Sequence, residues 1–492
     1  MGRDIDSIYY TREERQRYRA KVAKSLDVFE QMLATTQFAF DRPMTGMEVE
    51  LNLVGEDYRP RMDNADVLAA IADPEYQTEL ARYNIEFNVK PRSLTELDQL
   101  EDELRASLNR AEATCADRGT HLVMVGILPT VTEETFTGEW MSANARYAAL
   151  NDAVLTARGE DIYLDIEGPS GERVELFAES LAPESACTSM QLHLQVMPLD
   201  FADHWNAAQV LAGPQLAMGA NSPFFLGKDL WAETRIELFS QAADTRPVEL
   251  KNQGVRPRVF FGERWITSIF DLFEENVRYF PALLPDLDDE DPQAVLDAGG
   301  VPRLAEMRLH NGTIYRWNRP IYDTVGGTPH LRVENRVLPA GPTIIDTLAN
   351  AAFYYGTLRS LADDDRPVWT RMAFATAHEN FLEGAQRGID ANLFWPGRGE
   401  IPASELVLRQ LLPAAHEGLA DWGVAAPIRD RLLGVIEQRC LTGINGAEWQ
   451  RRAVARLERR GLDRPEALRQ MTRAYAERMH GNEPVHTWDL PA

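Results

Sequence analysis

The stretch "GMEVELNLV", residues 46–54, alternates apolar and polar side chains, which is the pattern of a β-strand with one buried face. In an extended chain Met47, Val49 and Leu51 point to one side, while Glu48 and Glu50 share the other. Two carboxylates on one face repel each other unless they take up protons or bind a cation. The stretch therefore predicts a strand of a sheet and raises the question of what neutralises its acids.

Three further stretches show the same alternation and place polar groups on one face. They are "YNIEFNVKP" (83–91) with Glu86 and Asn88, "SMQLHLQVMP" (189–198) with Gln191, His193 and Gln195, and "HLRVENRVLP" (330–339) with Arg332, Glu334 and Arg336. Together the four stretches predict an antiparallel sheet with one apolar and one polar face.

Two interpretations of the polar face are open. Antiparallel sheets commonly expose one side to water, and each stretch by itself fits that description. The first three stretches, however, offer acids with amide or imidazole groups, and Lys90 is their only lysine. Mg²⁺ and Mn²⁺ prefer such oxygen ligands and accept an occasional imidazole. We therefore favour a divalent-cation site over an ordinary wet face.

The last stretch places Glu334 between Arg332 and Arg336 on one face. Glu334 could hold a metal while the arginines hold phosphate oxygens; the alternative is a structural salt bridge within the trio. The sequence has no GxxxxGK[ST] and no strand-linked GxGxxG. A bound nucleotide would therefore be held by metals and arginines and not by a glycine-rich loop.

The segments around these strands are predicted to be mostly helical. Helices are expected over residues 11–35, over 93–119 with a capping box from Ser93 to Glu96, and over 145–159. "THLVMVGILPT" (120–130) is predicted to be a strand. Beyond residue 342 the pattern is mainly helical, with a Pro- and Gly-marked connection at 392–404.

Composition narrows the class of function. The 492 residues carry a net charge of −25, which argues against nucleic acid or an anionic membrane as a partner and leaves small ligands. No run of eighteen apolar residues and no secretory signal is found, so we expect a soluble cytoplasmic protein. The wide spacing of the three cysteines argues against a disulfide framework, a zinc knuckle or attached haem. The absence of HExxH and GxSxG argues against the hydrolase chemistries that these motifs mark. The sequence offers no prediction of oligomeric state.

The motifs "GMEVELNLV", "YNIEFNV", "RYAALND", "SMQLHLQV" and "HLRVENRVLPAG", in this order, resemble the glutamate-cysteine ligase family, carboxylate-amine ligases related to glutamine synthetase. The resemblance implies an α+β fold in which a curved, mainly antiparallel sheet forms a half-funnel backed by helices. The resemblance covers roughly residues 40–350. With the helical patterns on either side, we expect an N-terminal helical segment over 1–40, a catalytic domain over 41–345, and a helical C-terminal region over 346–492 packed on that domain.

The resemblance further implies a set of site residues. The metal ligands would be Glu48, Glu50, Glu86, His193 and Glu334. Arg336, with Glu334, would act in catalysis, and ATP would contact Arg336, Arg332 and Gln195. The amino-acid substrates would contact Arg146, Tyr147, Arg258, Asn311, Trp317 and Arg319.

The implied reaction uses ATP and Mg²⁺ or Mn²⁺ to join two amino acids, glutamate and cysteine by default, as in glutathione biosynthesis. A substrate carboxylate becomes an acyl phosphate, and an amine then displaces phosphate. The resemblance leaves the base that deprotonates the amine unassigned. Two alternatives stay open: a phosphotransferase of the guanidino-kinase type, and a non-catalytic descendant that binds a nucleotide or a partner protein.

Overall fold

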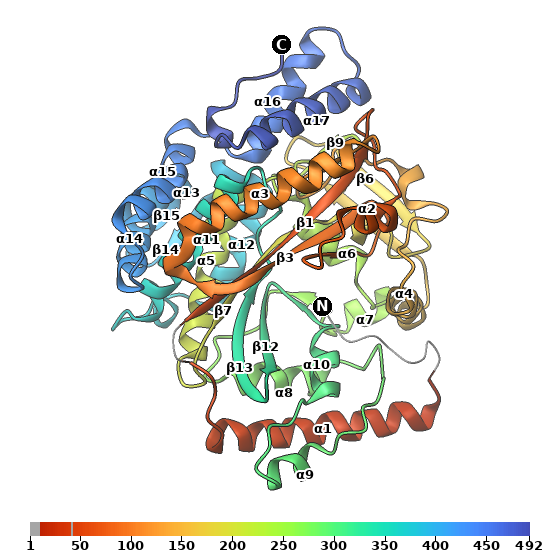
Figure 1. Ribbon diagram of the computed structural model, residues 1–492, viewed down its shortest axis with the longest axis vertical. Coiled ribbons are helices and arrows are strands. Elements are labelled where there is room, and N and C mark those ends of the chain that lie inside the picture. Colours follow the sequence, from red (N-terminus) through yellow and green to blue (C-terminus); the bar gives the residue numbers. More distant parts are fainter. Residues whose placement is uncertain (1–9, 41–42) are drawn as a thin grey trace.

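The centre of the molecule is a seven-stranded antiparallel sheet, seen in Figure 1 with helices around it. The computed structural model describes residues 10–40 and 43–492. The strand order is β12-β13-β7-β1-β3-β2, and β4 also pairs with β1. The strands are β1 (Met44–Gly55), β2 (Tyr76–Thr78), β3 (Asn84–Ser93), β4 (Thr120–Val123), β7 (Met190–Gln195), β12 (Asn318–Val325) and β13 (Thr328–Asn335).

The four strands predicted from alternation are neighbours in this sheet, in the order β13-β7-β1-β3. In the register, Glu50 lies opposite Glu86, and His193 lies opposite Glu334. Glu48 lies opposite Gln191 on β7. Because directly opposed residues point to the same side of a sheet, the polar groups of all four strands share one face.

The apolar face of the sheet packs against α5 (Phe201–Gly219) and α11 (Ile344–Ala362). Val49 and Leu51 are 1% exposed on this side. From α11, the Tyr355 hydroxyl lies 3.1 Å from the backbone carbonyl oxygens of both Gly46 and His193, to which it can donate. The helices therefore support the sheet from behind and leave its polar face toward the opposite side.

Two local predictions differ from the structure. The helix expected from Ser93 is α3 (Leu97–Ala116), which follows a 3₁₀ turn at Leu94–Glu96, and the Ser93 side chain makes no capping hydrogen bond. The strand expected over 120–130 ends at Val123. Beyond Val123, the Val125 carbonyl accepts a hydrogen bond from the side-chain amide of Asn52 (3.2 Å). A side chain therefore takes the place that the backbone of a neighbouring strand would have as its partner.

The helix predicted over residues 11–35 is α1 (Arg12–Thr35), which begins with a capping box formed by Thr11 and Glu14. It contacts α8 (Ile269–Tyr279), α9 (Pro292–Asp297) and α10 (Ala305–Asn311), and runs along the bottom of Figure 1. The N-terminal part of the segment predicted over 1–40 and the junction at residues 41 and 42 lie outside the described residues.

The C-terminal part is mainly helical, as predicted, and packs on the sheet's supporting helices. α12 contacts α5, α14 and α15 contact α11, and Arg439 on α15 forms a fully buried ion pair with Asp346 (2.8 Å). The domain boundary predicted at 345/346 stays a prediction. The helices are α12 (Phe374–Arg387), α13 (Ala403–Leu406), α14 (Leu412–Asp421), α15 (Ala426–Thr442), α16 (Gly446–Arg459) and α17 (Arg464–Gly481).

The connection at 392–404 contains a hairpin that the sequence interpretation missed, formed by β14 (Asn392–Trp395) and β15 (Gly399–Pro402). Gly397 and Gly399 have φ values of 78° and 73°, a region that glycine enters without steric cost. Because Pro and Gly mark any turn, their presence did not distinguish a hairpin from an irregular loop.

The remaining elements surround the sheet. The helices not yet introduced are α2 (Asn64–Ile71), α4 (Ala145–Arg158), α6 (Thr234–Ala242) and α7 (Val248–Asn252). Neither these nor any other helix in the described part of the chain combines the length and apolar character needed to cross a membrane. The small two-stranded sheets pair β5 (Ile162–Glu167) with β6 (Arg173–Ala178), β8 (Phe224–Phe225) with β9 (Lys228–Asp229), and β10 (Val259–Phe260) with β11 (Tyr315–Arg316).

Candidate functional site

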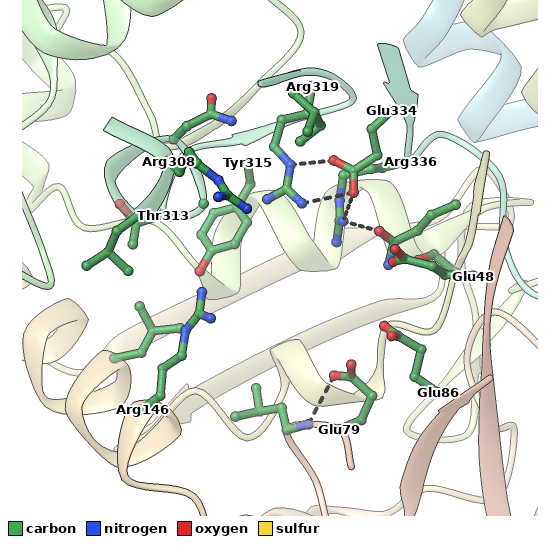
Figure 2. A pocket seen from close by; sticks show the side chains of 18 of the residues that line it. Glu48, Glu79, Glu86, Arg146, Arg308, Thr313, Tyr315, Arg319, Glu334 and Arg336 are labelled. Atoms are coloured by element: carbon green, nitrogen blue, oxygen red, sulfur yellow. Dashed lines mark hydrogen bonds and ion pairs between the residues drawn. The ribbon is translucent and has the colours of Figure 1, made fainter. Parts of the chain in front are cut away.

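The polar face of the sheet forms one wall of a cavity of about 460 Å³. Residues of α4, α10 and β11 line the wall opposite to it. Figure 2 shows carboxylates from the sheet, among them Glu48 and Glu86, on one side of this space and Arg146, Arg308 and Tyr315 on the other. The cavity therefore joins an acidic surface to a basic one.

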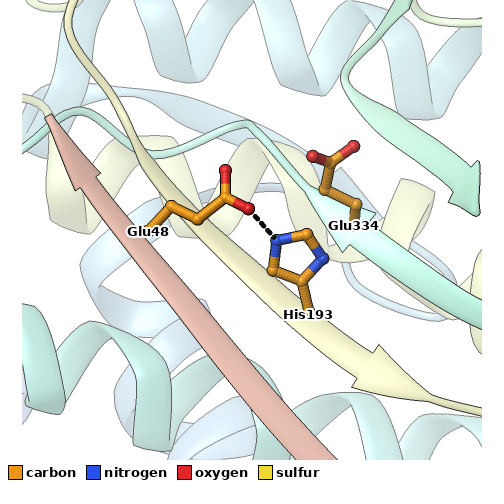
Figure 3. Close-up of side chains that lie close together, drawn as sticks. All are labelled: Glu48, His193 and Glu334. Carbon is orange, nitrogen blue, oxygen red and sulfur yellow. Dashed lines mark hydrogen bonds and ion pairs between the residues drawn. The ribbon is translucent and has the colours of Figure 1, made fainter. Parts of the chain in front are cut away.

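Glu48, His193 and Glu334 come from three adjacent strands and converge in the cavity (Figure 3). Each offers one ligand atom within 4.8 Å of the other two. His193 Nε2 lies 3.1 Å from Glu48 Oε1. Burial raises the pKa of Glu48, but the adjacent imidazole outweighs this effect and leaves the pKa below its ordinary value. The sheet thus brings together three of the predicted metal ligands.

Glu50, Glu79 and Glu86 form a second cluster, again with ligand atoms within 4.8 Å of one another. The Glu50 carboxylate accepts hydrogen bonds from Ser189 Oγ and from the Gln191 amide, both at 3.1 Å. Burial, followed by the charges of Glu48 and Glu50, raises the pKa of Glu86 to about 7, and burial raises those of Glu50 and Glu79. The three acids therefore favour protons or a cation.

Glu334 also belongs to a network of arginines. The Arg319 guanidinium donates two hydrogen bonds to its carboxylate, one of them 2.9 Å long, and Arg336 Nη1 lies 3.2 Å away. Burial alone would raise the pKa of Glu334, but these two cations hold it well below its usual range. The third arginine considered, Arg332, points elsewhere, toward Asp323 (3.7 Å) and His330 (2.8 Å). Glu334 is consequently an ionised group shared between the cluster and an ion pair.

The donor set of the two clusters suits Mg²⁺ or Mn²⁺. It consists of five carboxylates and one imidazole. Both ions favour oxygen ligands and accept an occasional imidazole. His193 Nδ1 is buried and has no hydrogen-bond partner among residues 10–40 and 43–492. A cation in each cluster would relieve the repulsion between carboxylates that burial imposes.

Most of the predicted substrate residues line the cavity. Arg146 has no hydrogen bond or ion pair from its side chain to any described residue, whereas the Tyr147 hydroxyl donates to the Thr78 carbonyl (3.2 Å). The side-chain amide of Asn311 donates to the Pro320 carbonyl (2.8 Å) and accepts from the Asn276 side chain (2.9 Å). Trp317 is 4% exposed, and Arg319 holds Glu334 as described above. Among these, Arg146 is the group most available to a ligand.

Two predicted contacts lie outside the cavity lining. The Arg258 guanidinium is 1% exposed and donates to the backbone carbonyls of Thr313 (3.0 Å) and Pro281. The Gln195 amide donates to the Ala39 carbonyl (2.7 Å). The side-chain donors of both residues are thus engaged with backbone carbonyls and do not face the cavity.

Sequence reasoning missed several groups that line the cavity. Glu79 follows the three-residue strand β2, and Glu184 lies on a 3₁₀ turn, so neither belongs to an alternating pattern. Arg308 is on the short helix α10, where it pairs with Asp323 (2.6 Å). Short elements carry too few residues to show a period, and only the folded chain brings these side chains to the cavity.

Comparisons with known proteins agree with this architecture. A family model described as glutamate-cysteine ligase family 2 matches residues 44–478. No curated protein matches the chain. The glutamate-cysteine ligase of Francisella tularensis, solved in complex with AMP, is 12% identical, with a TM-score of 0.55 over 92% of this chain and 91% of that one.

A second solved structure, the bifunctional glutathione synthetase of Pasteurella multocida, is also 12% identical, with a TM-score of 0.51 over 93% of this chain and 55% of that one. This chain therefore spans about half of the bifunctional protein. At such identity the likeness shows the fold alone. It confirms the predicted curved antiparallel sheet backed by helices with a helical C-terminal region.

Proposed function

The chain belongs to glutamate-cysteine ligase family 2, and on this basis we propose that it is an ATP- and Mg²⁺-dependent carboxylate-amine ligase that forms a γ-glutamyl amide bond. The observation that carries the proposal is the pair of acidic clusters at one face of the sheet. In the same cavity they lie opposite Arg146, whose side chain has no partner among the described residues, and Arg308, which pairs with Asp323. Such a site can hold cations, phosphates and the carboxylate of a substrate together.

In this proposal the two clusters, Glu48 with His193 and Glu334, and Glu50 with Glu79 and Glu86, hold the divalent ions. Bound Mg²⁺ supplies positive charge that stabilises the phosphoryl oxygens of ATP during transfer. Manganese would serve the same purpose with the same ligands.

The arginines at the sheet supply the remaining positive charge. Arg336 contacts Glu334 and the Gln191 amide oxygen, so its guanidinium is held beside both clusters, where the phosphates of ATP would lie. Arg319 keeps Glu334 ionised and oriented through two hydrogen bonds. Arg332, engaged with Asp323 and His330, lines the cavity and would assist at its edge.

The chemistry then consists of two displacements. A carboxylate oxygen of the acid substrate attacks the γ-phosphorus of ATP, and ADP leaves; an amine then attacks the carbonyl carbon of the acyl phosphate, and phosphate leaves. Arg146 lies beside Tyr315, on the side of the cavity opposite the carboxylates (Figure 2). It would bind a carboxylate of the amino-acid substrates. Little is required of a protein nucleophile, and positioning is the main task.

A screen of amino-acid pairs tests the proposal, beginning with L-glutamate and L-cysteine. The expected result is Mg²⁺-dependent release of both ADP and phosphate, together with a conjugate detected by mass spectrometry and abolished by EDTA. A kinase would release ADP and keep the phosphate on its product, and a binding protein would release neither. The glutamate-cysteine pair would place the enzyme in glutathione biosynthesis.

A further inference from the structure

The proposed ligation needs a base, because an amine at neutral pH is largely protonated and its nitrogen has no free electron pair. Among the cavity-lining glutamates of the described chain, Glu184 is the one outside both acidic clusters. The lining aspartates are engaged: Asp288 pairs with Arg303 (2.7 Å) and Asp323 with Arg308 (2.6 Å). Glu184 is therefore the cavity carboxylate that remains for a substrate.

The backbone around Glu184 is fixed while its carboxylate is free. Glu184 opens a 3₁₀ turn (Glu184–Ala186), its N–H donates to the Leu181 carbonyl (2.9 Å), and its own carbonyl accepts from the Cys187 N–H (3.0 Å). Its side chain is half-buried and makes no hydrogen bond or ion pair with any residue in the described ranges. A rigid turn thus presents an unengaged acceptor to the cavity.

Several charged or titratable groups act on this carboxylate from the neighbouring elements. The charges of Glu50 and Arg336 act on it from the sheet. The charge of Glu184 in turn acts on the Tyr315 hydroxyl on β11, and the charge of Arg146 on α4 acts on the same hydroxyl. The remaining neighbours are Tyr83, Tyr147 and Cys187. Glu184 therefore lies between the acidic clusters, the phosphate-facing arginine and the end of the cavity that carries Arg146.

We propose that Glu184 is the general base of the ligation step, accepting a proton from the ammonium group of the amine substrate. This inference rests on the proposed function. The ammonium N–H gives its proton to a Glu184 carboxylate oxygen, and the freed electron pair of nitrogen forms a bond to the carbonyl carbon. The bond from that carbon to the phosphate oxygen breaks, and phosphate leaves with its electrons.

The electrostatics of the site agree with this role. Burial and the nearby Glu50 raise the pKa of Glu184 to about 8, against a smaller opposite effect of Arg336. A base whose pKa lies near the working pH combines a useful ionised fraction with real affinity for the proton. Since the ionised form is the active one, ligation is expected to rise with pH toward this value.

Replacing Glu184 by glutamine tests the role by comparing two amines. The wild type and Glu184→Gln are assayed with ATP, Mg²⁺ and L-glutamate, using either L-cysteine or hydroxylamine. Hydroxylamine is largely unprotonated at neutral pH and traps an acyl phosphate as a hydroxamate without a base. The variant is expected to lose about 100-fold or more in the rate with cysteine, while hydroxamate formation changes less than about threefold.

Glu179→Gln is the matched control, because Glu179 is exposed five residues earlier and does not line the cavity. It is expected to leave both rates unchanged. A pH profile adds a second readout: the rate with cysteine should level off near pH 8 in the wild type and in Glu179→Gln, whereas in Glu184→Gln it should start lower and keep rising above pH 8, because that variant depends on free amine. Thermal unfolding of the variants verifies that each one is folded.

Distinct results would overturn the role of Glu184. Equal loss of conjugate and hydroxamate in Glu184→Gln would assign the residue to acyl phosphate formation, and full activity with cysteine would leave it no role. A rise in the KM for glutamate in the hydroxylamine assay would make it a contact of the acid substrate. If the wild type forms neither product, the proposed function fails and this inference fails with it.

Discussion

The acidic cluster of Glu50, Glu79 and Glu86 should make the metal-free protein lose stability as the pH rises. The three carboxylates lie within 4.8 Å of one another, and Glu86 is 3% exposed. Burial and its charged neighbours raise the pKa of Glu86 from 4.5 to about 7. The unfolded chain, in which these neighbours are dispersed, releases the same proton near 4.5.

The magnitude follows from this difference. Between the two pKa values the folded state binds more protons than the unfolded state, so the free energy of unfolding falls as the pH rises through this window. One pKa unit corresponds to about 1.36 kcal/mol, so the stabilising contribution present below pH 4.5 drops by about 3 kcal/mol by pH 8. Glu86→Gln removes this titration and should flatten the pH dependence by about that amount.

Urea denaturation between pH 5 and pH 8 measures the effect, with EDTA or with saturating Mg²⁺. Mg²⁺ should restore stability to the wild type at pH 8, by about 2.7 kcal/mol when its concentration is 100-fold above Kd, and should stabilise Glu86→Gln much less. The exposed Glu179→Gln serves as control. Identical pH dependence of Glu86→Gln and the wild type in EDTA would refute the reasoning.

Three further substitutions examine other parts of the structure. Arg336→Ala should raise the KM for ATP about tenfold or more while leaving the Mg²⁺ requirement unchanged, and unaltered ATP kinetics would exclude the phosphate role. Arg439→Met leaves the buried Asp346 carboxylate unpaired and should cost about 3–5 kcal/mol in urea denaturation; a loss under about 1 kcal/mol would show that the pair contributes little. Tyr355→Phe removes the hydroxyl through which α11 reaches the backbone of Gly46 on β1 and His193 on β7, and should cost about 1 kcal/mol, with weaker Mg²⁺ binding in equilibrium dialysis; unchanged binding would show that this contact does not support the site.

The sequence predicted the sheet well because alternation is a local property. Glu48, Glu86, His193 and Glu334 each lie in a stretch whose period of two assigns them to one face, whatever the rest of the chain does. The failed predictions were also local. Ser93 had capping-box spacing without a capping hydrogen bond, and the segment after Val123 was apolar without a strand partner.

Which side chains pair across the site was harder to predict from the sequence. Glu334 was considered with Arg332 and Arg336, its neighbours in the same stretch of sequence, yet its strongest partner is Arg319 on the adjacent strand β12. Arg319 was expected to contact substrate. Which arginine reaches the carboxylate depends on the register between β12 and β13, and periodicity within one strand does not specify that register.

The sequence by itself determined which side chains share a face, since neighbouring Cβ positions along a strand alternate and its polar residues must avoid the apolar core. Only the tertiary structure decided that β13, β7, β1 and β3 lie side by side, and that Glu79, just after β2, and Glu184, on a 3₁₀ turn, join the cavity. The physical reason is distance along the chain. Contacts between residues separated by a hundred or more positions form when hydrophobic burial closes the fold, and no local pattern records them.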